Sequence, residues 1–192
     1  IKFISDSLPV IEEGSLKADG FIHKISFKSY EEWLECRVQK DFKRMISQAR
    51  KRGVYVTKHV DFSSIDCFWR MHALLRLGKF LEIPQPRIFF ENIYKEYFLK
   101  EKGFTYIARE SNGNPIGSVV LLIDGKTAFY KFNASKFEFL KMRPNNLLID
   151  QIVYDLDKLG IDNIYVRQEQ DINLCNALII ALLYFISNFP NP

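Results

Sequence analysis

Apolar residues along this chain follow two periods, and the change between them separates a helical first part from a sheet. Between Ser29 and Arg52 they recur every three or four positions, which is the spacing of one face of an α-helix. Ser29 opens a capping-box pattern with Glu32. We predict one helix from Ser29 to about Arg52, closed by Gly53. Its apolar stripe comprises Leu34, Val38, Phe42, Met45 and Ala49.

Two more helices are predicted before the period changes. Ser63 heads a second capping box and starts one of them. The other runs from Arg87 to Lys102 and ends before Gly103. Short strands are expected at Lys2–Ile4, Phe21–Phe27 and Val54–Val60.

A period of two then predicts three antiparallel strands joined by short turns. These are Phe104–Glu110, Ile116–Ile123 and Thr127–Ala134. A helix from Pro144 to Leu159, a strand at Ile161–Val166 and a last helix in the uncharged tail complete the pattern. We therefore expect an α+β fold, with a mixed sheet that has a central antiparallel meander and is flanked by helices.

The composition fits one globular domain. The 192 residues are 47% hydrophobic and 15% aromatic, which is enough for a sizeable core. The three cysteines lie far apart, so we expect neither a metal site nor a disulfide framework. The apolar part of the tail, Leu174–Ile186, is shorter than the ~20 residues of a membrane-spanning helix. We expect a cytoplasmic domain without a transmembrane segment.

The net charge of +4 is concentrated in one segment. Between Cys36 and Lys58 there are eight basic residues and one acid, so the rest of the chain is net negative. Such a face binds phosphate groups or nucleic acid, or it is a solvated helix surface, and the sequence favours neither. The basic residues on this face of the first helix are Arg37, Lys40, Arg44 and Lys51.

Five motifs resemble those of the FemAB-like branch of the GNAT acyltransferase superfamily. Residues 44–53 read RMISQARKRG and are similar to that branch's basic helix before a Gly-Val strand. Residues 68–76 and 85–91 read FWRMHALLR and QPRIFFE, and they resemble its Met-His…Arg…Pro…Phe-Phe signature. YKFNAS at 130–135 and PNNLL at 144–148 resemble its central hairpin and the helix that follows.

The resemblance implies transfer of an acyl or aminoacyl group, often from aminoacyl-tRNA, onto an amine of a cell-wall or saccharide precursor. It also implies direct transfer, without a covalent enzyme intermediate. Longer members carry another GNAT-like unit before this one. We therefore expect residues 1–29 to be an extension or a remnant of a preceding unit, and the N-terminal half of a longer enzyme to be missing. Residues 30–192 would form the acyltransferase domain, atypical after residue 166.

The chain departs from the family in two places. Ordinary GNAT enzymes bind the pyrophosphate of acyl-CoA at a glycine-rich helix N-terminus, but residues 142–146 contain no glycine, and Pro144 has no N–H. We expect aminoacyl-tRNA rather than acyl-CoA as the donor, and no bound cofactor. After Val166 the family's basic segment is missing. Both departures favour the alternative function, a catalytically inactive GNAT-like binding or assembly domain with a basic phosphate-binding helix, whereas the polar strand and the Met-His…Arg pair favour the transferase.

The candidate site lies along the last strand of the meander, which we expect to diverge from the strand at Ile161–Val166. Alternation places Lys131, Asn133 and Ser135 on one face of the strand, and Tyr130 with Phe132 on the other. Lys131 is the candidate catalytic residue, because its ammonium group can stabilise the oxyanion that develops when an amine attacks a carbonyl. The candidate substrate-binding residues are His72, Arg76, Tyr130, Asn133, Ser135, Asn145, Asn146 and Arg167.

Each candidate also has a structural interpretation. His72 and Arg76, four residues apart, are also compatible with a histidine in the core beside an arginine whose charged end reaches solvent. The polar strand face is compatible with simple exposure to water, and the two asparagines are compatible with a helix cap.

Overall fold

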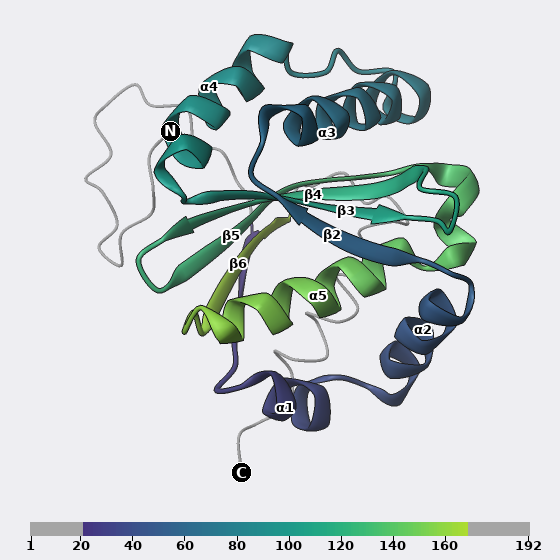
Figure 1. Ribbon diagram of the computed structural model, residues 1–192, viewed down its shortest axis with the longest axis vertical. Coiled ribbons are helices and arrows are strands. Elements are labelled where there is room, and N and C mark those ends of the chain that lie inside the picture. Colours follow the sequence, from purple (N-terminus) through teal and green to yellow (C-terminus); the bar gives the residue numbers. More distant parts are fainter. Residues whose placement is uncertain (1–20, 169–192) are drawn as a thin grey trace.

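The computed structural model describes residues 21–168, which form one six-stranded mixed sheet with helices on both faces (Figure 1). The strand order is β1-β6-β5-β4-β3-β2, and every neighbouring pair is antiparallel except β5 with β6. The strands are β1 (Phe21–Ser26), β2 (Tyr55–His59), β3 (Gly103–Arg109), β4 (Pro115–Asp124), β5 (Thr127–Ser135) and β6 (Asn163–Gln168). The predicted α+β class and its central antiparallel meander, β3-β4-β5, are confirmed.

The helices lie in layers around the sheet (Figure 1). Helices α3 and α4 cover one face, α5 covers the other, and α1 and α2 pack against the outer side of α5. The α-helices are α1 (Tyr30–Glu32), α2 (Lys40–Lys51), α3 (Phe62–Leu75), α4 (Arg87–Tyr97) and α5 (Pro144–Lys158). Shorter helical turns are η1 (Trp33–Arg37), η2 (Arg76–Phe80), η3 (Phe98–Lys100) and η4 (Phe137–Met142).

The prediction of one continuous helix from Ser29 to Arg52 was wrong. The capping bond from Glu32 N–H to Ser29 Oγ is present, but the backbone becomes extended at Val38 and the helix restarts as α2. The reason is the packing of Trp33 against Phe42, whose ring centroids are 5.9 Å apart. Nine residues of straight helix would separate them by ~13 Å along the axis, so both rings can enter the core only if the helix breaks.

Two helix ends differ from the predicted positions. The N-cap of α3 is Asp61 rather than Ser63, because the Asp61 carboxylate accepts the Ser64 N–H at 2.9 Å. The third predicted helix stops at Tyr97, and one 3₁₀ turn leads to Glu101 in the left-handed conformation, with φ 58°. β3 thereby starts at Gly103, one residue earlier than the pattern suggested.

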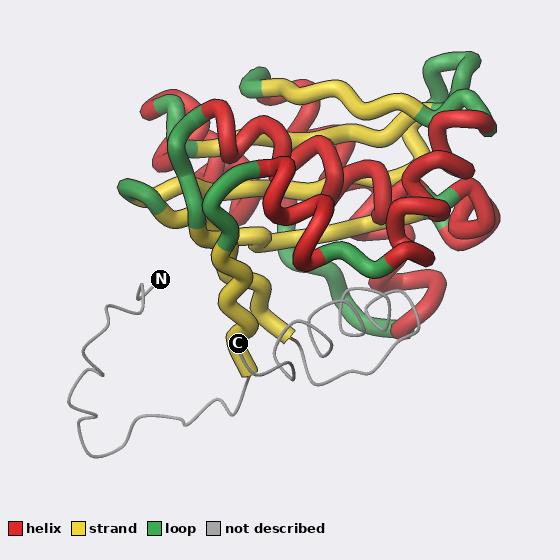
Figure 2. The backbone as a smooth tube through the Cα atoms, turned by 90° about the horizontal axis from the view of Figure 1, so that it is seen from below, coloured by secondary structure: helices red, strands yellow, loops and turns green. Residues whose placement is uncertain are grey.

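The segment expected to be an N-terminal extension contributes a strand to the sheet. Residues 21–26 form β1, which pairs along its whole length with β6. In Figure 2 the two strands that adjoin the grey segments, β1 and β6, run at a steep angle to the other four. The strand expected at Lys2–Ile4 and the helix expected in the tail lie outside the described residues. Among residues 21–168, no helix is long and apolar enough to cross a membrane.

Gly103 allows β3 to start directly against a buried aromatic ring. A Cβ atom added at Gly103 would lie 2.2 Å from Cδ2 of Phe98, whose side chain is 3% exposed. The ring is enclosed by the core between the sheet and α3–α4, so it has little room to move aside.

We predict that Gly103→Ala destabilises the fold by about 1–3 kcal/mol, the usual cost of overpacking a filled core. The denaturant midpoint measures this change. Gly78→Ala is the control, because a Cβ at Gly78 meets no atom within 4 Å, and we expect it to be neutral or slightly stabilising in its helical turn. Equal midpoints for the two variants would contradict the steric argument.

Candidate functional site

β5 carries one extra residue relative to β4. Consecutive residues of β4 pair with Phe132 and Tyr130, so Lys131 is the bulged residue between them. The bulge shifts the side-chain alternation, and Tyr130 shares the α5 face with Asn133 and Ser135. Phe132 packs on the α3–α4 face. The predicted division of these side chains was wrong, because regular alternation does not hold across a bulge.

The parallel pair of strands separates at the same residue. β5 pairs with β6 only from Thr127 to Tyr130, opposite Asn163 to Val166. β6 then continues along β1 to Gln168, while the rest of β5 pairs with β4 alone among the described strands. The expected divergence of these two strands within one sheet is confirmed, and Lys131 is the first residue of β5 beyond their shared ladder.

A group of hydrogen bonds joins β5 to the first turn of α5. Asn133 Nδ2 donates to the Tyr130 hydroxyl at 2.7 Å and lies 3.5 Å from Asn145 Oδ1. Ser135 Oγ donates to the same Asn145 oxygen at 2.5 Å. Gly117 of β4 keeps this contact possible, since a Cβ there would lie 3.1 Å from Ser135 Oγ. The structure therefore brings four of the predicted substrate-binding residues together.

The hydroxyl of Tyr130 is a hydrogen-bonding group rather than an anion. Its side chain is 8% exposed, and burial raises the pKa of Tyr130 well above the ordinary value of a phenol, although the bond from Asn133 opposes that shift. Tyr130 is consequently protonated at neutral pH.

Helix α5 begins without a side-chain cap. Arg143 occupies the N-cap position in the left-handed conformation, with φ 62°, and Pro144 is the first helical residue. Asn145 bonds to β5, and Asn146 Nδ2 lies 3.6 Å from Sδ of Met45 in α2. The interpretation of the two asparagines as helix caps is therefore wrong. Their amide groups connect α5 to its neighbouring layers.

His72 and Arg76 lie on the opposite face of the sheet from the asparagines. His72 is 5% exposed, its ring stacks on Phe68 at 5.5 Å, and its Nε2 lies 2.5 Å from Oε1 of Gln85. Arg76 forms an ion pair with Glu82 at 3.0 Å. The sheet thus divides the predicted substrate-binding residues into two groups, and β5 is the element that borders both.

The two remaining candidate site residues are Lys131 of β5 and Arg167 of β6. Lys131 is half-buried, and its Nζ lies 5.8 Å from the ring centroid of Phe132. Arg167 pairs with Ile22 of β1, one residue beyond the last β5–β6 pair.

The predicted basic face is present on α2. Lys40, Arg44 and Lys51 are exposed, and Arg44 forms an ion pair with Asp41 at 3.2 Å. The opposite face of α2 is buried through Phe42, Ile46 and Ala49. Arg37 precedes the helix break in η1, so it does not share a helix with the other three residues.

A buried carboxylate that was not predicted from the sequence lies near the site. Asp150 of α5 is 2% exposed and accepts hydrogen bonds from Arg50 Nη2 at 2.6 Å and from the Tyr30 hydroxyl at 2.8 Å. Burial raises the pKa of Asp150, while the bond from Tyr30 and the charge of Arg50 act against that rise. Burial and the neighbouring carboxylate raise the pKa of Tyr30 to about 12. The sequence did contain a sign of this buried carboxylate, because Asp150 falls within the apolar stripe of α5, four residues after Asn146.

The family of the chain follows from its sequence. Residues 37–166 match the model of the acetyltransferase (GNAT) domain family. This match covers more than half of the chain, and the chain therefore belongs to the GNAT acetyltransferase family. Among curated proteins, no sequence matches this chain.

Solved structures share the fold at low sequence identity. FemX has a TM-score of 0.70 and 12% identity over 85% of this chain, which spans 57% of the FemX chain. A GNAT-family acetyltransferase from Staphylococcus aureus Mu50 has a TM-score of 0.52 and 19% identity, covering 70% of this chain and 82% of that chain. The ribosomal-protein-S18-alanine N-acetyltransferase from Escherichia coli has a TM-score of 0.53 and 13% identity, covering 72% and 79%. At these identities the similarity shows a shared fold.

The buried ion pair should make one substitution pH-dependent. A carboxyl whose pKa is higher in the folded state than in the unfolded state stabilises the fold below its unfolded pKa, and this contribution is lost as the pH rises through the folded pKa. Arg50→Met removes a charge that lowers the pKa of Asp150. The variant should therefore lose more stability at pH 7 than at pH 4.5.

At pH 7 we expect a loss of about 1 kcal/mol, modest because the Arg50 side chain is 59% exposed, and the denaturant midpoint at both pH values measures it. Arg44→Met is the matched control, since both Arg44 and its partner Asp41 are exposed, and it should change stability little. A loss for Arg50→Met that is the same at both pH values would contradict the role of Asp150.

Proposed function

We propose that this chain is an acyltransferase that moves an acyl or aminoacyl group onto an amine-bearing acceptor, such as a cell-wall or saccharide precursor. The observation that carries the proposal is the separation of β5 from β6 at the bulged residue Lys131. Beyond Tyr130, the backbone groups of β5 do not pair with β6. The polar residues Tyr130, Asn133 and Ser135 lie on the same stretch of β5, where they form hydrogen bonds with one another and with Asn145 of α5.

In this proposal Lys131 stabilises the charge of the transition state. The acceptor amine attacks the carbonyl carbon of the donor ester, and the carbonyl oxygen becomes an oxyanion that the Lys131 ammonium group neutralises. The new C–N bond forms as the ester C–O bond breaks, and the proton lost by the amine ends on the departing hydroxyl. Tyr130 and Asn133 hold this part of β5 in place, because their side chains bond to each other across the bulge.

We further propose aminoacyl-tRNA rather than acyl-CoA as the donor. A pyrophosphate site at a helix N-terminus relies on free backbone N–H groups and on close approach of the chain. At α5 the first helical residue is Pro144, which has no N–H to offer a phosphate. The similarity of the fold to FemX is compatible with this donor preference.

Lys131→Met should separate catalysis from stability. Methionine keeps the aliphatic stem and removes the charge, so the free energy of unfolding should change by less than about 1 kcal/mol. The single-turnover rate of aminoacyl transfer should fall by roughly 10²-fold or more, as when one oxyanion-stabilising group is lost. The two measurements are a denaturant midpoint and a rapid-quench transfer assay on the same preparation.

Lys126→Met is the control for this variant, because Lys126 is exposed in the turn between β4 and β5 and lies outside the site. It should leave both values unchanged. Strong destabilisation of Lys131→Met with full activity of the folded fraction would make Lys131 a structural residue. A wild-type protein that transfers no acyl group but still binds phosphate-bearing ligands would favour the alternative of a catalytically inactive binding domain.

The donor preference predicts a weak response to coenzyme A. Ligand stabilisation grows as RT ln(1 + [L]/Kd), so a ligand without a site leaves the melting temperature unchanged. We expect no shift with acetyl-CoA at millimolar concentration. A rise of several degrees would show that the N-terminus of α5 binds the pyrophosphate in spite of Pro144, and would overturn this donor assignment.

A further inference from the structure

The exposed side of α2 carries a row of basic residues with little acidic compensation. Successive positions of the helix place Lys40, Lys43, Arg44 and Lys51 on the side opposite the buried Phe42, Ile46 and Ala49. Of these four, Arg44 forms an ion pair with Asp41, and both partners remain mostly exposed. From Lys40 to Lys51 the helix rises by eleven steps, which extends this row over ~16 Å.

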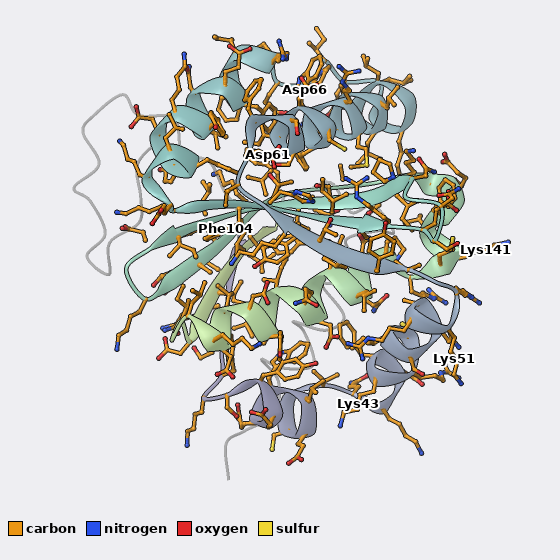
Figure 3. All side chains as sticks on the ribbon, viewed as in Figure 1. Lys43, Lys51, Asp61, Asp66, Phe104 and Lys141 are labelled. Carbon is orange, nitrogen blue, oxygen red and sulfur yellow. The ribbon has the colours of Figure 1, made fainter. Side chains whose placement is uncertain are left out.

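The row continues onto a second element that the sequence separates from it by 89 positions. Arg52, at the end of α2, donates a hydrogen bond to the backbone carbonyl of Lys141 in η4. This bond brings Lys141, itself exposed, next to the C-terminal end of α2. Figure 3 shows Lys141, Lys51 and Lys43 along the same side of the molecule. We call Lys40, Lys43, Arg44, Lys51 and Lys141 the α2–η4 surface.

Helix α2, which carries most of the α2–η4 surface, also contacts helix α5 of the candidate site. Met45 contacts Asn146 in the first turn of α5, and Arg50 binds Asp150 one turn later. η4 leads directly from the end of β5 to the start of α5. A molecule bound along this surface would therefore end beside the polar residues of β5 and α5.

The spacing of the charges indicates the class of ligand. Phosphates of a nucleic-acid strand follow one another at intervals of a few ångström, so a ~16 Å row of cations can contact several of them at once. A small nucleotide places its few phosphates at one point and would use only part of the row. Within residues 21–168, the lysines of this surface form no ion pair with an acidic side chain. Such lysines are suited to contacts with a phosphate backbone, which position a ligand without reading its sequence.

We propose that the α2–η4 surface binds the phosphate backbone of the RNA that carries the aminoacyl donor, and so directs the aminoacyl end toward β5. This inference rests on the proposed function for the identity of the RNA. Its test uses deacylated tRNA, so that binding is measured apart from transfer.

The experiment compares two triple variants with the same change of charge. Lys43→Gln, Lys51→Gln and Lys141→Gln together remove three charges of the surface. The control combines Lys95→Gln, Lys102→Gln and Lys126→Gln, which are exposed on α4, before β3 and in the β4–β5 turn. Fluorescence anisotropy with labelled tRNA at several salt concentrations measures both affinity and its salt dependence.

We expect the surface variant to bind tRNA at least ~10-fold more weakly, and its slope of log affinity against log salt to fall by about three, one for each lost phosphate contact. The control variant should match the wild type. Equal weakening of both variants, or of neither, would overturn the inference, because binding would then depend on net charge alone or on another surface.

The failure of this inference is distinguishable from failure of the proposed function. If the protein transfers no aminoacyl group but the surface variant alone loses tRNA binding, the surface is supported and the transferase is not. If transfer proceeds and the surface variant keeps the wild-type KM for aminoacyl-tRNA, the surface is refuted while the transferase stands. A weakened affinity for coenzyme A with unchanged tRNA binding would also refute it.

Discussion

The extra residue in β5 is the constraint on which the arrangement of this domain depends. Because Lys131 is bulged against β4, the side chains before and after it exchange faces, and the twist of the strand changes locally. The ladder with β6 ends at Tyr130, the residue before the bulge. A regular β5 would place Tyr130 and Asn133 on opposite faces and would remove the hydrogen bond between them.

The second organising feature is the polar contact between helix layers on the α5 face. Asp150 is almost completely buried and binds groups from both α1 and α2. A buried carboxylate of this kind stabilises an arrangement only while its partners are present, because the unpaired charge is costly in the core. Asp150 therefore specifies how α1 and α2 pack on α5. In this arrangement the basic residues of α2 face outward beside η4.

Membership of the GNAT family and the start of α5 give different indications about the donor. The family model describes an acetyltransferase domain, whereas Pro144 removes one backbone N–H from the helix N-terminus at which a pyrophosphate would bind. The proposed aminoacyl-tRNA donor would reconcile the two, because the transfer chemistry would be retained while the phosphates would bind along the proposed α2–η4 surface.

The sequence by itself determined the order of elements, the α+β class, the meander and the presence of a basic helix face, because each depends on local periodicity, turns and caps. It also identified Tyr130, Asn133, Ser135 and Asn145 as candidate substrate-binding residues. Only the tertiary structure decided which faces they occupy, since a bulge depends on pairing with the neighbouring strand. The break at Val38 and the buried Asp150 were likewise decided by contacts between distant segments, which local patterns do not encode.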